Sequence, residues 1–113
     1  MATLKYHHPG IPTNQKRDNE TFLEDFKVHA SGYESGPYKI EWMRFEKNFR
    51  TPKLVKTIPR VAFEVDDLND AIKEKEILIE PIYPSPGVTL ALIINNGAPV
   101  EFLLPHESIA KDY

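Results

Sequence analysis

Apolar and polar residues alternate most regularly at positions 60–65, where Val61, Phe63 and Val65 take every second place. A period of two is typical of a strand with one buried side. Asn95-Asn96-Gly97 favours a tight hairpin turn later in the chain. Longer apolar runs predict three more strands around that turn, at 76–83, 88–94 and 99–104.

A short amphipathic helix is predicted directly after the strand at 60–65. Asp66-Asp67 can cap its start, and Leu68, Ala71 and Ile72 follow at helical spacing before two lysines. The second half therefore reads strand, helix, then three strands.

The first half is less regular. Aromatic and branched residues predict a strand over 38–45, and 21–33 also has a strand-like pattern. Residues 14–20 are polar and fit either a loop or a single helical turn, whereas 48–57 reads as a polar connection carrying Pro52. The whole pattern predicts an α+β domain with high strand content.

Composition narrows the function classes. A chain of 113 residues with 41% hydrophobic and 27% charged residues fits one soluble domain, covering 1–113. The net charge of −3, with no basic run, argues against nucleic-acid binding. The absence of cysteine excludes disulfides and thiolate metal sites. Neither a glycine-rich phosphate loop nor a serine-nucleophile motif occurs, so no nucleotide cofactor is expected.

The hydropathy of the chain predicts its cellular location. No run of about 18 apolar residues could span a membrane. The first residues lack the apolar core of a signal peptide, so we expect a cytoplasmic protein without membrane association.

Several short segments occur in a defined order along the chain: His8-x-Gly10-Ile11, Ile40-Glu41-Trp42, Pro59 to Leu68 and Gly97 to Leu103. This order resembles the vicinal oxygen chelate superfamily. That superfamily includes glyoxalase I, methylmalonyl-CoA epimerase, extradiol dioxygenases and bleomycin-resistance proteins. Ile40-Glu41-Trp42-Met43 also repeats as Val100-Glu101-Phe102-Leu103, as expected of a duplicated module.

The resemblance implies two βαβββ-type modules, at about 4–48 and 58–105, whose mixed sheet curls around one cavity. The first module is abbreviated. In metal-using members, four His and Glu ligands come from the opening and closing strands. Carried over by position, His8, Glu41 and Glu101 match the first, second and fourth ligands. The third ligand position holds Arg60 instead of His.

Two interpretations of this site remain open. His8, Glu41 and Glu101 could hold a divalent metal, either Zn²⁺, Ni²⁺, Mn²⁺ or Fe²⁺. Arg60 argues against it, because a guanidinium has no lone pair to donate and repels a cation. Alternatively, Arg60 replaces the metal charge by pairing with Glu41 or Glu101, or it clamps an anionic ligand. We favour loss or weakening of the metal site.

Strand alternation selects further residues for the cavity. Met43 and Phe45 share a face with Glu41, and Leu103 shares one with Glu101. We therefore expect Arg60 and these three apolar side chains to contact a substrate. Alternation also places Arg60 opposite the apolar face at 61–65.

The resemblance implies a glyoxalase-like lyase or isomerase acting on a small oxygenated metabolite, with Glu41 and Glu101 as the catalytic acid–base pair. The alternative is a non-catalytic protein of the bleomycin-resistance type that binds a small molecule. A third possibility is an interaction subunit in which Glu41 and Arg60 form a closed ion pair with no pocket beside them. A homodimer is expected, because the short first module leaves edges to cover.

Overall fold

Eight strands and three short helices form the computed structural model, which describes residues 3–47, 50–85 and 87–106. The strands are β1 (Leu4–Pro12), β2 (Thr21–Leu23), β3 (Val28–Ser31), β4 (Glu41–Phe45), β5 (Arg60–Val65), β6 (Glu76–Ser85), β7 (Val88–Asn95) and β8 (Ala98–Pro105). The helices are the 3-10 turn η1 (Glu24–Phe26), α1 (Lys53–Thr57) and α2 (Leu68–Ile72). No helix in these described ranges has the length and apolar character needed to span a bilayer.

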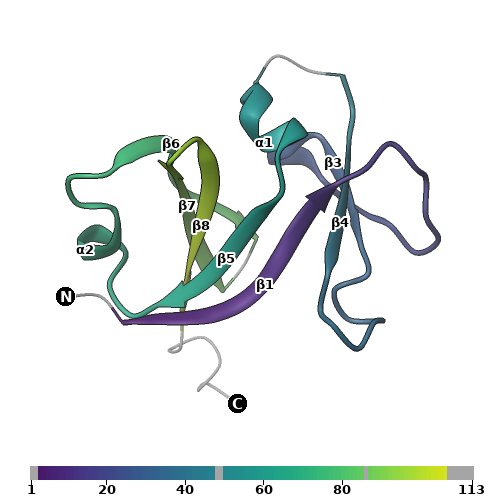
Figure 1. The fold of residues 1–113 in the computed structure, drawn as a ribbon. Coiled ribbons are helices and arrows are strands. Elements are labelled where there is room, and N and C mark those ends of the chain that lie inside the picture. The colour runs from purple at the N-terminus through teal and green to yellow at the C-terminus, as the bar shows by residue number, and fades with distance from the viewer. Residues whose placement is uncertain (1–2, 48–49, 86, 107–113) are drawn as a thin grey trace.

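All eight strands belong to one curled, mixed sheet with the order β2-β3-β4-β1-β5-β8-β7-β6. The long strands β1 and β5 run antiparallel through its middle, with β8 and β7 on one side and β4 and β3 on the other (Figure 1). The high strand content agrees with the predicted α+β class.

The two halves of the chain pair their strands in the same way. β1 is parallel to β4, and β5 is parallel to β8. In each half, two further strands then add in antiparallel fashion, β3 and β2 in one and β7 and β6 in the other. The halves differ in their first connection, because α2 follows β5 whereas a loop over 13–20 follows β1.

The second half matches its sequence pattern closely. β5 spans 60–65 as predicted, and α2 begins after Asp67, whose side chain accepts a 3.0 Å hydrogen bond from the backbone N–H of Asp70. Asn96 and Gly97 take positive φ angles of 51° and 82° in the turn between β7 and β8. These are the backbone conformations that a tight hairpin turn requires.

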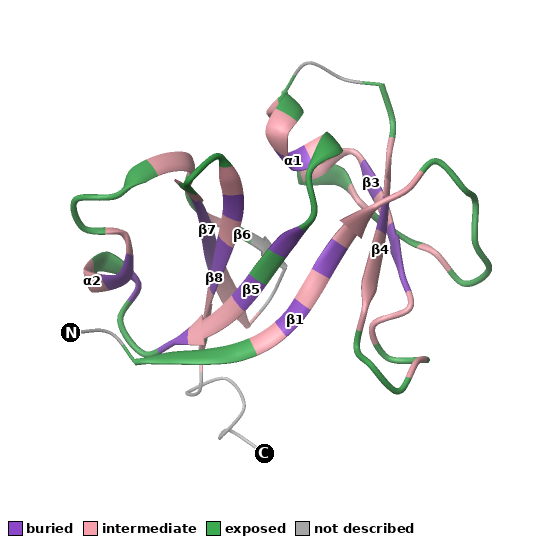
Figure 2. Cartoon of the chain, in the orientation of Figure 1, coloured by how far each residue is buried: buried purple, intermediate pink, exposed green. Residues whose placement is uncertain are grey.

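Apolar side chains pack on both faces of the sheet. Alternate residues of β7 separate them: Ala91 and Ile93 join the cluster beneath α2, whereas Leu90 and Leu92 join a cluster with Val55 of α1. Figure 2 shows buried positions along β7 and β8 and again on β1 and β5. The second cluster surrounds the candidate site.

Four predictions about local structure need correction. The segment 21–33 is a hairpin interrupted by η1, with Lys27 at a φ of 51°, and is not one strand. The strand expected from residue 38 begins at Glu41, because Lys39 has a φ of 57°. The connection predicted at 48–57 contains the helix α1. Residues 48 and 49 lie outside the described residues, and so does the end of the first predicted module at 48. Val61, expected on a buried face, is 40% exposed.

Candidate functional site

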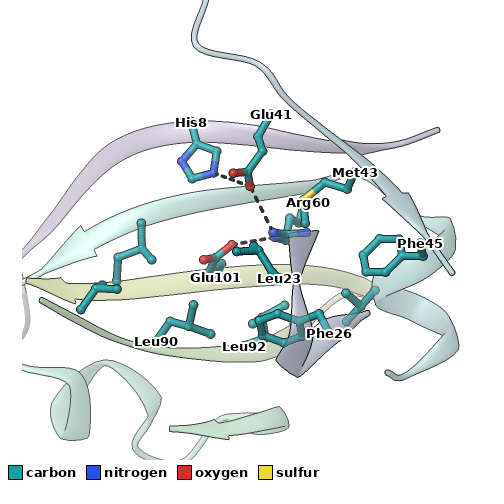
Figure 3. Close-up of a pocket in the computed structure, with 13 residues that line it drawn as sticks. His8, Leu23, Phe26, Glu41, Met43, Phe45, Arg60, Leu90, Leu92 and Glu101 are labelled. Carbon is teal, nitrogen blue, oxygen red and sulfur yellow. Dashed lines mark hydrogen bonds and ion pairs between the residues drawn. The ribbon is translucent and has the colours of Figure 1, made fainter. Parts of the chain in front are cut away.

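A cavity of about 160 Å³ opens on the face of the sheet that bears Leu90 and Leu92. The four neighbouring central strands β4, β1, β5 and β8 each contribute one polar side chain to its wall, as Figure 3 shows. In that strand order, these side chains are Glu41, His8, Arg60 and Glu101. The sequence analysis selected these same four residues, and the fold brings them together.

Strand register explains how they meet. Gly10 of β1 lies opposite Glu41 on one neighbouring strand and opposite Arg60 on the other. Because Gly10 has no side chain, the Arg60 guanidinium can lie over β1 and approach Glu41. A Cβ atom added at Gly10 would stand only 3.2 Å from the Cζ atom of Arg60. Gly10 therefore creates the space that the guanidinium uses.

Arg60 links the two carboxylates. Its Nε donates a 2.6 Å hydrogen bond to Oε1 of Glu101, and its Nη2 lies 3.6 Å from Oε1 of Glu41. Both Arg60 and Glu101 are buried, whereas the Glu41 side chain keeps 23% of its surface exposed. Arg60 thus supplies the positive charge that two carboxylates in an apolar wall need.

His8 stands on the other side of Glu41. Its Nε2 lies 3.5 Å from Oε1 of Glu41, which is ion-pair distance without hydrogen-bond geometry. Burial acts to raise the pKa of Glu41, but His8 and the Arg60 guanidinium outweigh burial and hold that pKa below its ordinary value of 4.5. Glu41 is therefore ionised at neutral pH.

A chain of polar groups continues from His8 to Tyr33. The Nδ1 atoms of His7 and His8 are 2.8 Å apart, and the Tyr33 hydroxyl lies 3.4 Å from Nε2 of His7. The Glu41 carboxylate favours a proton on Nε2 of His8, so the His7 Nδ1–H donates to His8 and the Tyr33 hydroxyl donates to His7. Burial and the charge of His8 lower the pKa of His7, in keeping with a neutral ring.

The apolar candidates also line the cavity. Met43 and Phe45 reach it from β4, and Leu103 reaches it from β8. Trp42 and Arg44, at the alternate positions of β4, have partners elsewhere, as alternation predicts: Arg17 lies over the Trp42 ring, and Arg44 pairs with Glu20.

Sequence reasoning did not select several other lining residues. Leu90 and Leu92 could have been found, because they alternate along an apolar strand that was predicted. Phe26 and Val55 could not, since each lies in a helix of five residues or fewer, which is too short to show a hydrophobic period.

The residues of this cavity do not fit a divalent metal ion. Arg60 occupies the space between Glu41 and Glu101, and its cationic guanidinium would repel an ion placed there. Within the described part of the chain, no three His, Asp or Glu side chains are grouped as metal ligands. The interaction-subunit hypothesis fits no better, because it required a Glu41–Arg60 pair without a pocket beside it.

Comparisons with known proteins do not name a family. No protein-family model matches the sequence, and no curated protein matches it significantly. The resemblance to the vicinal oxygen chelate superfamily therefore stays a prediction from the matched segments of the sequence.

Proposed function

We propose that this chain is a small-molecule-binding protein with a vicinal oxygen chelate fold, in which the Arg60 guanidinium takes the place of the metal. Two observations support the fold assignment. Each half pairs its strands as a βαβββ module would, and the loop over 13–20 stands where the first module would have its helix. The first module is then abbreviated by the loss of that helix.

The placement of Arg60 carries the proposal. The guanidinium lies within 3.6 Å of one carboxylate and 2.6 Å of the other, at the centre of the four positions that the family uses for metal ligands. Because the guanidinium already pairs with both carboxylates, they do not depend on a metal ion for a positive charge. The site can therefore hold an organic ligand without a metal.

The state of the carboxylates favours binding over catalysis. A general base works best when its pKa lies near the operating pH. The pKa of Glu41 is instead held low, and Glu101 accepts a short hydrogen bond from Arg60. Glu41 is therefore a weaker base than an ordinary carboxylate, and Arg60 engages the carboxylate of Glu101.

The cavity suits a small apolar group. Apart from the four polar residues, its walls are apolar side chains from both halves and from α1. Its volume of about 160 Å³ is close to that of engineered cavities, roughly 150 Å³, that bind benzene. The ligand portion buried there is therefore about the size of one aromatic ring.

Metal content tests the proposal. Protein purified without chelator or nickel resin should carry no stoichiometric Zn²⁺, Ni²⁺, Mn²⁺ or Fe²⁺. Arg60→His should gain a metal, because it restores the His at the third ligand position of the family pattern. The matched control is Arg44→His, which alters an arginine that pairs with Glu20 outside the cavity and should gain none. Near-stoichiometric metal in the native protein would overturn the proposal.

A metal-free lyase or isomerase is the second candidate. It is favoured by the polar chain from Tyr33 through the two histidines to Glu41, which could deliver a proton to a ligand in the cavity. Its test is deuterium exchange from solvent into the C–H groups of dihydroxyacetone and similar hydroxyketones. Exchange that Glu41→Gln abolishes would support an enzyme, and no exchange with any of them would reject it.

A further inference from the structure

A second hollow adjoins the cavity, and its lining differs in character. This groove has a volume of about 350 Å³ and is lined by residues of 18–35. Leu23 and Glu41 line both the groove and the cavity, so the two spaces meet at these side chains. A ligand longer than one ring can therefore extend from the cavity past Glu41 into the groove.

The groove is acidic. Asp18, Glu34 and Glu41 line it, and no described lysine or arginine is among its lining residues. Lys39, from a neighbouring segment, lies over the Tyr33 ring, 5.5 Å from its centroid. In the cavity, the carboxylates Glu41 and Glu101 outnumber the guanidinium of Arg60, and Asp18 and Glu34 add two further carboxylates at the groove.

One buried polar atom borders the groove without a partner. Ser31 lines the groove and is more than nine-tenths buried. In the part of the chain that the structure describes, its Oγ has no hydrogen-bond partner, whereas Nε2 of the buried His8 faces Glu41 at 3.5 Å. Buried polar groups are almost always hydrogen-bonded in proteins, so the Ser31 hydroxyl indicates that a ligand completes the site.

Glu41 is the group best placed to hold a charged ligand. Its carboxylate lies 3.5 Å from His8 and 3.6 Å from Arg60, and its side chain keeps 23% of its surface exposed. An ionised carboxylate can accept about four hydrogen bonds. Arg60, by contrast, already donates to Glu101. Its single positive charge is shared between Glu41 and Glu101, and the groove adds only carboxylates. The excess of negative charge therefore favours a cationic ligand over an anionic one.

We propose that the cavity and groove together bind one small amphipathic amine, with its ring in the cavity and its ammonium group on Glu41. The inference rests on the proposed binding function and adds the ligand class to it. The ring replaces water against the apolar wall, and the ammonium donates to the lone pairs of Glu41. Polar groups further along the ligand would meet Asp18, Glu34 and Ser31 in the groove.

Three probes of one size and different charge test the proposal: benzylamine, benzyl alcohol and benzoate. Dissociation constants from calorimetry at neutral pH should rank benzylamine tightest, about tenfold or more below benzyl alcohol, with benzoate weakest. Equal or tighter binding of the alcohol or of benzoate would overturn the amine inference and leave the proposed binding function standing. Failure of all three to bind would overturn both.

Single variants test whether the Glu41 carboxylate causes the preference for benzylamine. Glu41→Gln should remove the preference for benzylamine while benzyl alcohol still binds, which also shows that the variant folds. Asp18→Asn, in the loop of the groove, should weaken benzylamine less. Glu74→Gln, on an exposed residue outside both spaces, should leave all three affinities unchanged. A benzylamine preference that persists in Glu41→Gln would overturn the assignment of the ammonium group to Glu41.

Discussion

Nε of Arg60 donates a 2.6 Å hydrogen bond to Oε1 of Glu101, and more than nine-tenths of each residue is buried. The two side chains project from β5 and β8, which lie side by side in the sheet. Each charge is tolerated in this apolar wall because the other is present. Removing one partner is therefore a more severe change than removing both.

Arg60→Met should destabilise the protein by roughly 3–5 kcal/mol, since it leaves the Glu101 carboxylate buried without its cation. Urea unfolding at pH 7 measures the change. The double variant Arg60→Met, Glu101→Met should recover much of the loss, because two apolar side chains can replace a buried ion pair at little cost. A double variant as unstable as Arg60→Met would show that loss of the ion pair does not cause the destabilisation.

Gly10→Ala should disturb the same ion pair from the neighbouring strand. The new Cβ would lie 3.2–3.3 Å from three atoms of the buried Arg60 side chain, which has little room to move. We expect a loss of about 1–2 kcal/mol, as for overpacked sites. The matched control is Gly36→Ala, whose Cβ would meet only the Gly32 carbonyl oxygen at 3.5 Å. Similar losses in both variants would argue against crowding of Arg60.

Glu20 should contribute to acid stability. Its two carboxylate oxygens accept hydrogen bonds from Arg44, and the Arg44 hydrogen bond lowers the pKa of Glu20 from 4.5 to about 2. A carboxyl whose pKa is depressed by folding stabilises the protein above its unfolded pKa, and this contribution is lost as the pH falls through the folded value. The window is therefore pH 4.5 down to about 2.

Glu20→Gln should remove that pH dependence. Urea midpoints measured from pH 7 to pH 2 should fall less steeply in the variant than in the native protein below pH 4.5. Glu74→Gln, for which the described residues provide no ion-pair partner, is the control and should follow the native curve. An unchanged slope in Glu20→Gln would mean that the pair with Arg44 does not persist in solution.

The sequence specified the second half well because its signals are local. Alternation at 60–65, the Asp67 cap and the Asn96-Gly97 turn each depend on neighbouring residues, and the structure contains all three. The first half was predicted less well. Positive φ angles at Lys27 and Lys39 interrupt its strands, and neither residue is a type that signals such a backbone.

The sequence analysis selected the four polar residues of the candidate site. His8, Glu41, Arg60 and Glu101 line one cavity because strand pairing places their strands next to one another in the sheet. The contacts that define its chemistry depend on tertiary structure. The groove beyond Glu41 and the proximity of Tyr33 to His7 come from two segments. The sequence pattern left the conformation of 14–20 open, and it predicted a strand over 21–33 where the structure has a hairpin interrupted by η1.

Leu92→Ala should enlarge the cavity at a cost in stability. Leu92 is 2% exposed and lines the cavity, so removing its side chain should destabilise the protein by about 2–5 kcal/mol. The control is Val61→Ala, on a residue that is 40% exposed, where a loss below about 1 kcal/mol is expected.

The space that Leu92→Ala adds to the cavity should also change which ligand size binds best. Calorimetry with benzyl alcohol and its 4-methyl derivative should show that Leu92→Ala favours the larger ligand relative to the native protein. If stability falls as expected but the size preference does not move, the ring of the ligand does not occupy this cavity.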